Sequence, residues 1–119
     1  MTYAVIVDDE REWRELIGQA LADAGCEVRA FGNGWRALED MERRRPDVAL
    51  LDVRMKPSGG EVLREVRHRW PSMPVIMVSS YWGHAEDPDV MRASAFVRKK
   101  LDIGGLSEDL VRILVRIRR

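Results

Sequence analysis

Short apolar runs alternate with amphipathic segments along the whole of this chain of 119 residues. A short apolar run is typical of a buried parallel strand, and apolar residues spaced three or four apart are typical of a helix that packs on one face. Alternating strands and helices imply right-handed crossovers and a parallel sheet covered on both sides. No repeat, low-complexity tract or linker interrupts the pattern. We therefore expect one α/β, doubly wound domain over residues 1–119.

The apolar runs place the strands and the spacing between them places the helices. The expected strands are Tyr3–Val7, Glu27–Phe31, Asp47–Leu51, Pro74–Val78 and Ala95–Arg98. The expected helices are Glu10–Ala24, a second with Trp35, Leu38 and Met41 on its inner face that stops before Pro46, Glu61–Trp70, and a last one from Ser107, a suitable N-cap. Helices therefore follow most of the strands, as a doubly wound fold requires.

The segment Tyr81–Ser94 departs from this alternation, because Gly83 and Pro88 interrupt it. Proline inside a helix costs about 3 kcal/mol. A helix that has Asp87 as its N-cap and ends near Arg92 or Ala93 avoids this cost. We expect the helix between the fourth and fifth strands to be short or irregular.

The composition excludes several classes of protein. Twenty basic and twenty acidic residues cancel, so no overall charge favours binding to nucleic acid or to a membrane surface. No apolar run approaches membrane-spanning length, and the chain starts almost directly with a strand, which predicts a cytoplasmic protein. The lone Cys26 has no partner for an internal disulfide and is predicted to be a small buried hydrophobe.

Charged residues follow three of the predicted strands, at Asp8-Asp9, Asp52 and Lys99. The carboxyl ends of parallel strands form the edge at which open α/β sheets bind ligands. Adjacent carboxylates repel each other unless a cation neutralises them, and hard oxygen ligands suit Mg²⁺. The simpler interpretation is that these acids only favour the positive N-terminus of the following helix.

A carboxylate such as Asp52 can accept a phosphoryl group and form a mixed anhydride. This transfer needs positive charge near the phosphoryl oxygens, which Lys99 can supply, and Ser79 offers a hydroxyl at the same edge. The chain has only three lysines, Lys56, Lys99 and Lys100, so a lysine at the end of the last strand is less readily explained as surface filler. For Asp52 and Ser79 alone, a turn-capping role is the simpler explanation.

The joint pattern resembles the receiver domains of two-component response regulators. That family has an acidic pair after the first strand, an acceptor aspartate after the third and a Ser or Thr after the fourth. An aromatic residue then precedes, by three positions, a lysine that ends the fifth strand. The corresponding residues here are Asp8, Asp9, Asp52, Ser79, Phe96 and Lys99, and the likeness extends over essentially the full length.

The resemblance implies a flavodoxin-like sheet with strand order 2-1-3-4-5 and a phosphorelay role rather than a separate enzymatic activity. By the same resemblance, Asp52 accepts a phosphoryl group from a histidine kinase. Asp9 binds Mg²⁺ directly, Asp8 mainly through water, and Asp52 and the backbone carbonyl of Arg54 complete the protein ligands. Ser79 and Phe96 then move, which shifts the conformation and controls a downstream protein or an output domain that this chain lacks.

The chain departs from the family pattern in two loops. Lys100 replaces the usual proline after the family lysine and is a second candidate for its role; a cis bond there would cost about 2.5–4 kcal/mol. In the acceptor loop, either Gly59 or Gly60 matches the family glycine. Bulky Arg54 and Tyr81, two residues past Asp52 and Ser79, are predicted to shield the phosphoryl group from water.

Two other functions compete with phosphoryl acceptance. A degenerate pseudo-receiver would act as a protein-binding module without phosphorylation, as the missing proline and broken helix suggest. A haloacid-dehalogenase-like phosphatase would need a second aspartate two residues past Asp52, where Arg54 stands. A further hypothesis places a homodimer contact in residues 95–119, because Val111 and Val115 lie off the inner face of the last helix.

Overall fold

The computed structural model describes residues 1–80, 92–99 and 103–117. The strands are β1 (Tyr3–Val7), β2 (Glu27–Phe31), β3 (Val48–Asp52), β4 (Val75–Ser79) and β5 (Ala95–Arg98). The helices are α1 (Arg11–Asp23), α2 (Gly34–Arg43), α3 (Gly59–Arg69) and α4 (Ile103–Ile117). The strands form one parallel sheet in the order β2-β1-β3-β4-β5, which confirms the predicted fold class and strand order.

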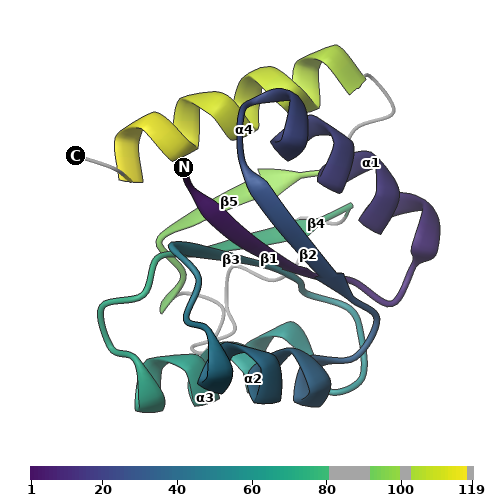
Figure 1. Cartoon of the computed structure of the whole chain (residues 1–119). Helices are drawn as coiled ribbons and strands as arrows, with labels where there is room; N and C mark the ends of the chain where they lie inside the picture. Colours follow the sequence, from purple (N-terminus) through teal and green to yellow (C-terminus); the bar gives the residue numbers. More distant parts are fainter. Residues whose placement is uncertain (81–91, 100–102, 118–119) are drawn as a thin grey trace.

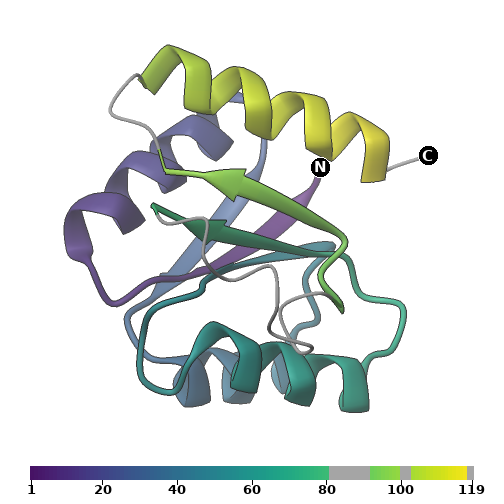
Figure 2. The ribbon, with the colours of Figure 1, turned by 180° about the vertical axis from the view of Figure 1, so that it is seen from behind.

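Helices cover both faces of the sheet. Helices α1 and α4 lie together on one face, and α2 and α3 lie on the other (Figure 1; Figure 2 gives the view from behind). Alternate residues of β1 point to opposite faces, so Ala4 and Ile6 pack toward α1 and α4, whereas Val5 and Val7 pack toward α2 and α3. Every residue of β1 and β3 is buried, which explains why both strands consist almost wholly of apolar residues.

The strand register brings the polar strand ends to one edge of the sheet. Val7 of β1 pairs with Leu51 of β3, so the residues that follow each of them are neighbours. Asp52 is the last residue of β3 and pairs with Val78 of β4. Ser79 ends β4, one residue later than predicted, beside Arg98 of β5. The predicted convergence of the strand ends is therefore a direct consequence of parallel pairing.

The starts of α2 and α3 are fixed by local capping. The Asn33 side chain accepts hydrogen bonds from the backbone N–H groups of Trp35 and Arg36. Ser58 and Glu61 form a reciprocal capping box, each side chain bonding the other residue's backbone N–H. Helix α3 consequently begins at Gly59, two residues before the predicted start at Glu61.

The predicted inner face of α2 is wrong at one residue. Trp35 does not face inward: it is 49% exposed, while Leu38 and Met41 are buried as predicted. Gly34 faces α3 instead, where an added Cβ would lie 2.4 Å from the Val62 side chain, so the helices approach too closely there for a large residue.

The last helix begins at Ile103 rather than at Ser107. Leu106 is completely buried against the sheet, and this packing extends the helix backward through two glycines despite their low helix propensity. Val111 and Val115 are 43% and 50% exposed, so α4 is not buried on that side; the homodimer contact there stays a prediction.

Some predictions fall on residues outside the described ranges. These are the short helix from Asp87, the positions of Tyr81 and Lys100, and the geometry of the Lys99–Lys100 bond, all of which stay predictions. Cys26 is buried, as expected. Within the described ranges, no helix is long and apolar enough to cross a membrane.

Candidate functional site

Acidic side chains and one lysine meet at the carboxyl edge of the sheet. Asp8 follows β1, Asp52 ends β3 and Lys99 follows β5; their exposed fractions are 1%, 4% and 6%. Asp9 and Glu10, in the turn between β1 and α1, are exposed beside them. We call these five residues the strand-end cluster. The structure thus brings together all the carboxylates and the lysine that the strand ends predicted.

The lysine lies among three carboxylates. Lys99 Nζ is 2.9 Å from Asp8 Oδ2, 3.2 Å from Glu10 Oε1 and 3.4 Å from Asp52 Oδ1. It also lies 5.3 Å from the centre of the Trp13 ring, within the range of a cation–π interaction. The resting site is therefore held together by one central ammonium group.

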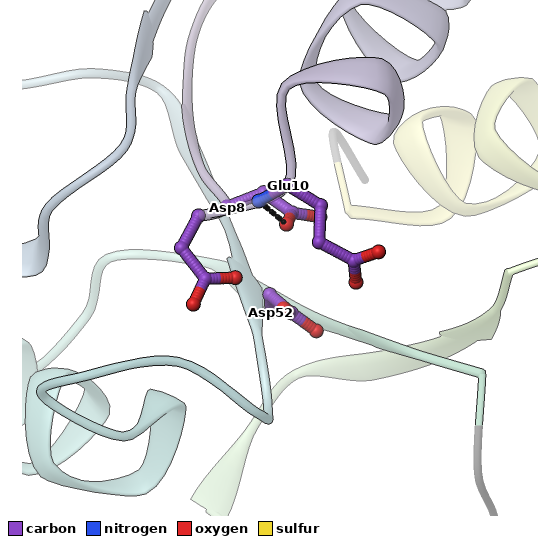
Figure 3. Close-up of side chains that lie close together, drawn as sticks. Asp8, Glu10 and Asp52 are labelled. Carbon is purple, nitrogen blue, oxygen red and sulfur yellow. Dashed lines mark hydrogen bonds between the residues drawn. The ribbon is translucent and has the colours of Figure 1, made fainter.

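Backbone contacts fix the orientation of these side chains. The Glu10 backbone N–H donates to Asp8 Oδ1 at 2.9 Å, which is the dashed line in Figure 3. The Asp8 N–H donates to the Phe31 carbonyl, and the Lys99 N–H donates to the Ser79 carbonyl. The carboxylates of Asp8 and Glu10, from the turn after β1, consequently gather with that of Asp52, from the end of β3 (Figure 3).

Gly59 makes room for the end of β3. An added Cβ at Gly59 would lie 2.3 Å from the Asp52 carbonyl oxygen and 2.9 Å from Val53 Cα. Backbone atoms cannot move aside as a flexible side chain can, so any larger residue would displace the end of β3. Of the two glycines that matched the family position, Gly59 is the one that this close approach requires.

Burial and mutual charge change the acidity of the site. Burial and the neighbouring Asp8 charge raise the pKa of Asp52 to about 6, against the opposing effects of Lys99 and a backbone hydrogen bond from Arg54. Burial alone would lower the pKa of the Lys99 ammonium, but the hydrogen bond to Asp8 and the charge of Asp52 outweigh it and raise that pKa. Lys99 therefore stays charged, while Asp52 is destabilised as a bare carboxylate.

The donor set fits a divalent cation. Asp8, Asp9, Glu10 and Asp52 each offer one carboxylate oxygen, and these oxygens lie within 4.8 Å of one another. The buried Asp52 Oδ2 accepts no hydrogen bond from the residues that the structure describes. Four carboxylates face a single ammonium, so a hard cation such as Mg²⁺ would supply both the missing charge and a partner for that oxygen.

The other predicted site residues surround this cluster. Ser79 is half-buried at the end of β4, and the Arg54 side chain is exposed in the loop after β3. Phe96 lies on the face of β5 opposite to the buried Val97 and is 42% exposed. Glu10 is the functional candidate that the sequence analysis did not select, because its position at a helix start had a sufficient explanation. Its position directly after Asp8 and Asp9 could have identified it as a member of the same site.

A family model described as the response regulator receiver domain matches residues 4–110. The response regulator protein PilR of Pseudomonas aeruginosa is 32% identical over 118 residues, which is 97% of this chain and 26% of PilR. The transcriptional regulatory protein DegU of Brevibacillus brevis is 34% identical over 109 residues, or 87% of this chain and 46% of DegU. The chain thus spans less than half the length of these curated relatives.

Solved structures show the same arrangement. The response regulator TrrA of Thermotoga maritima, crystallised in complex with Mg²⁺-BeF, has a TM-score of 0.86 and 29% identity, over 95% of this chain and 99% of TrrA. The chemotaxis response regulator CheY4 of Vibrio cholerae has a TM-score of 0.83 and 26% identity, over 95% of this chain and 98% of CheY4. These structures match essentially the whole fold.

Proposed function

The chain belongs to the response regulator receiver domain family of two-component systems, and we propose that it accepts a phosphoryl group on Asp52 from a histidine kinase. The proposal treats residues 1–119 as one receiver domain that acts in the cytoplasm on a downstream protein or output domain. Apart from its own phosphorylation and dephosphorylation, we propose no enzymatic activity.

The observation that carries this proposal is the environment of Asp52. Its carboxylate is buried at the end of β3, next to the Lys99 ammonium, and its Oδ2 atom has no hydrogen-bond partner among the described residues. Buried carboxylate oxygens are usually paired, and this unpaired one lies in a site that also holds a lysine and three further carboxylates. An unpaired oxygen that faces a site with a lysine is suited to attack phosphorus.

In the proposed reaction an Asp52 carboxylate oxygen forms a bond to phosphorus as the bond between phosphorus and the donor nitrogen breaks. The electron pair of that bond leaves with the donor imidazole, and Asp52 becomes an acyl phosphate. Lys99 stabilises the negative charge on the phosphoryl oxygens. Asp8, Asp9, Asp52 and the Arg54 carbonyl would hold Mg²⁺, which when bound neutralises further charge on the same oxygens.

The same proposal assigns Ser79 and Phe96 to the response. Ser79 ends β4, the strand that pairs with the strand of Asp52, which supports a role for its hydroxyl in bonding a phosphoryl oxygen. Phe96 is on the neighbouring strand and is 42% exposed, so it has apolar surface to bury by turning inward. Such a coupled movement is a shift between two populations, driven by the modified side chain.

Phosphoryl transfer can be tested with Mg²⁺ and a small phosphodonor, without a kinase. We expect a mass increase of one phosphoryl group that is stable in acid and labile in base, and that Asp52→Asn abolishes. Asp23→Asn, at the exposed end of α1, is the matched control and should be modified as wild type.

Other outcomes would identify the competing functions. A wild-type protein that neither binds Mg²⁺ nor forms the adduct would be a pseudo-receiver, and the proposal would be wrong. Steady release of phosphate from unrelated esters would indicate a phosphatase. The complete set of charged residues in the strand-end cluster supports the phosphoryl acceptor over both.

A further inference from the structure

Glu10 has an unusual position for the contact that it makes. It is the N-cap residue of α1, where a short polar side chain usually accepts a hydrogen bond from the first turn of the helix. The Glu10 side chain makes no such capping bond. It accepts a hydrogen bond from Lys99 Nζ at 3.2 Å instead, across 89 positions of sequence. The Glu10 side chain therefore does not cap its own helix but binds the lysine that follows β5.

Glu10 is one of three carboxylates beside Lys99. Carboxylate oxygens of Asp8, Glu10 and Asp52 lie 2.9, 3.2 and 3.4 Å from Lys99 Nζ. An ammonium group has only three hydrogen-bond donors. A phosphoryl group on Asp52 would therefore compete with these carboxylates for Lys99.

The three partners are not equally easy to release. The side chains of Asp8 and Lys99 are each 1% exposed, so breaking their contact would leave two buried charges unpaired. At Asp52, phosphorylation itself converts the carboxylate into the acyl phosphate that Lys99 then faces. The Glu10 side chain is 59% exposed and can return to water at little cost. Glu10 is therefore the partner that a phosphoryl group displaces.

We infer that Glu10 is a positioning residue that holds Lys99 in the resting state and competes with the phosphoryl group for it. This inference rests on the proposed function of Asp52. Because the Glu10–Lys99 contact is present before phosphorylation and absent after it, the contact favours the resting state alone. Weakening it should shift the protein toward the phosphorylated form.

The test measures the affinity for beryllofluoride, which has the shape and charge of a phosphoryl group, at saturating Mg²⁺. Glu10→Gln removes the charge of the side chain, and Glu10→Asp keeps the charge on a side chain too short to reach Lys99. Both should tighten binding by about two- to fivefold, the range for loss of one exposed ion pair. Glu12→Gln is the matched control, since it removes the same charge from an exposed side chain in the first turn of α1, and should leave the affinity unchanged.

A second measurement follows Lys99 directly in the metal-free protein. The chain has three lysines, so labelling the lysine ε-carbons gives an NMR spectrum of three signals, in which Lys99→Arg identifies that of Lys99. Both Glu10 variants should shift this signal and leave that of Lys56 in place. Glu12→Gln should shift neither.

Two results would overturn the inference and leave the proposed function intact. One is unchanged or weaker beryllofluoride binding by Glu10→Asp while wild type still forms the Asp52 adduct. The other is a loss of more than about tenfold in affinity for Mg²⁺ alone in both Glu10 variants, which would make Glu10 a metal ligand. If wild type binds no beryllofluoride and forms no adduct, the proposed function fails and the inference fails with it.

Discussion

Two groups of charged residues lie beside the same sheet and differ in how their charges balance. In the strand-end cluster, four carboxylates lie close together, three of them contact one lysine, and Asp8, Asp52 and Lys99 are buried. The carboxylates of this cluster therefore outnumber its single ammonium group.

The second group, which we call the α2–β2 cluster, is balanced. Arg29 of β2 pairs with Asp40 of α2 at 3.4 Å, and Arg44, just after α2, pairs with Glu27 of β2. Both arginine side chains are 55% exposed, and Arg44 also lies over the ring of Tyr3. One arginine therefore stands against each carboxylate, and both arginines reach water.

The comparison shows how a structural ion pair differs from a site. Balanced, half-exposed pairs need nothing more and contribute little to stability. A buried excess of carboxylates is unfavourable by itself, so a fold keeps it only where a cation or a reaction uses it. The unequal count of charges, rather than the presence of ion pairs, identifies the functional edge of the sheet.

The largest expected effect is the loss of the central ammonium. Lys99→Met leaves the buried Asp8 and Asp52 without a cation and should lower the free energy of unfolding of the metal-free protein by roughly 3 kcal/mol. Urea unfolding in the presence of a chelator measures this change, and adding Mg²⁺ should restore part of it. Lys56→Met, at an exposed position, should have little effect. If the two variants lost the same free energy of unfolding, the buried lysine would contribute no more to stability than an exposed one, and the prediction would be wrong.

Mg²⁺ binding at the strand-end cluster should stabilise the folded protein. At a Mg²⁺ concentration a hundred times the Kd of the wild type, the free energy of unfolding of the wild type should rise by about 2.7 kcal/mol. Asp9→Asn should raise the Kd and so reduce this gain, whereas Asp40→Asn should not. A gain that Asp9→Asn leaves unaltered would place the metal elsewhere.

The third effect is the pH dependence contributed by Asp52. Folding raises its pKa from 3.8 to about 6, so its contribution to stability is present below the lower value and is lost as the pH rises through the upper one. Without metal, Asp52→Asn should therefore be more stable than wild type by on the order of 1 kcal/mol near pH 8, allowing for partial solvation. This difference should close as the pH falls toward about 4. Urea unfolding at several pH values measures it, and a wild type more stable than Asp52→Asn near pH 8 would contradict the prediction.

The smallest effect is expected in the α2–β2 cluster. Asp40→Asn leaves Arg29 free to turn into water, so the free energy of unfolding should fall by no more than about 1 kcal/mol, and by less in high salt. Chemical unfolding at low and high ionic strength measures both. A loss as large as that of Lys99→Met would contradict the distinction between the two clusters.

Much of the fold follows from local sequence patterns. Each strand was predicted within one residue at either end. The three central strands β1, β3 and β4 are buried runs of mostly apolar residues, which makes them easy to recognise. The acidic and basic strand ends were also predicted, because parallel pairing brings the carboxyl ends of strands to one edge. These features depend only on periodicity and chain direction.

The errors arose where packing outweighs local preference. Trp35 looked like a core residue because it is large and apolar, yet the close approach of α2 to α3 at Gly34 leaves the tryptophan facing outward. Ser107 looked like the N-cap of the last helix, but burial of Leu106 extends α4 back over the two preceding glycines. Neither outcome can be read from propensity, since both depend on which surfaces meet.

The strands, their ends and the residue types that gather there could be predicted from the sequence, because they depend on patterns within a few positions. Which charged side chains pair with which depends on the tertiary structure. Three features depend on distances between separate segments: Lys99 bonds Glu10 across 89 positions, Asp52 Oδ2 has no hydrogen-bond partner among the described residues, and Gly59 leaves room for the end of β3. Electrostatic and steric energies depend on those distances, and no local pattern contains them.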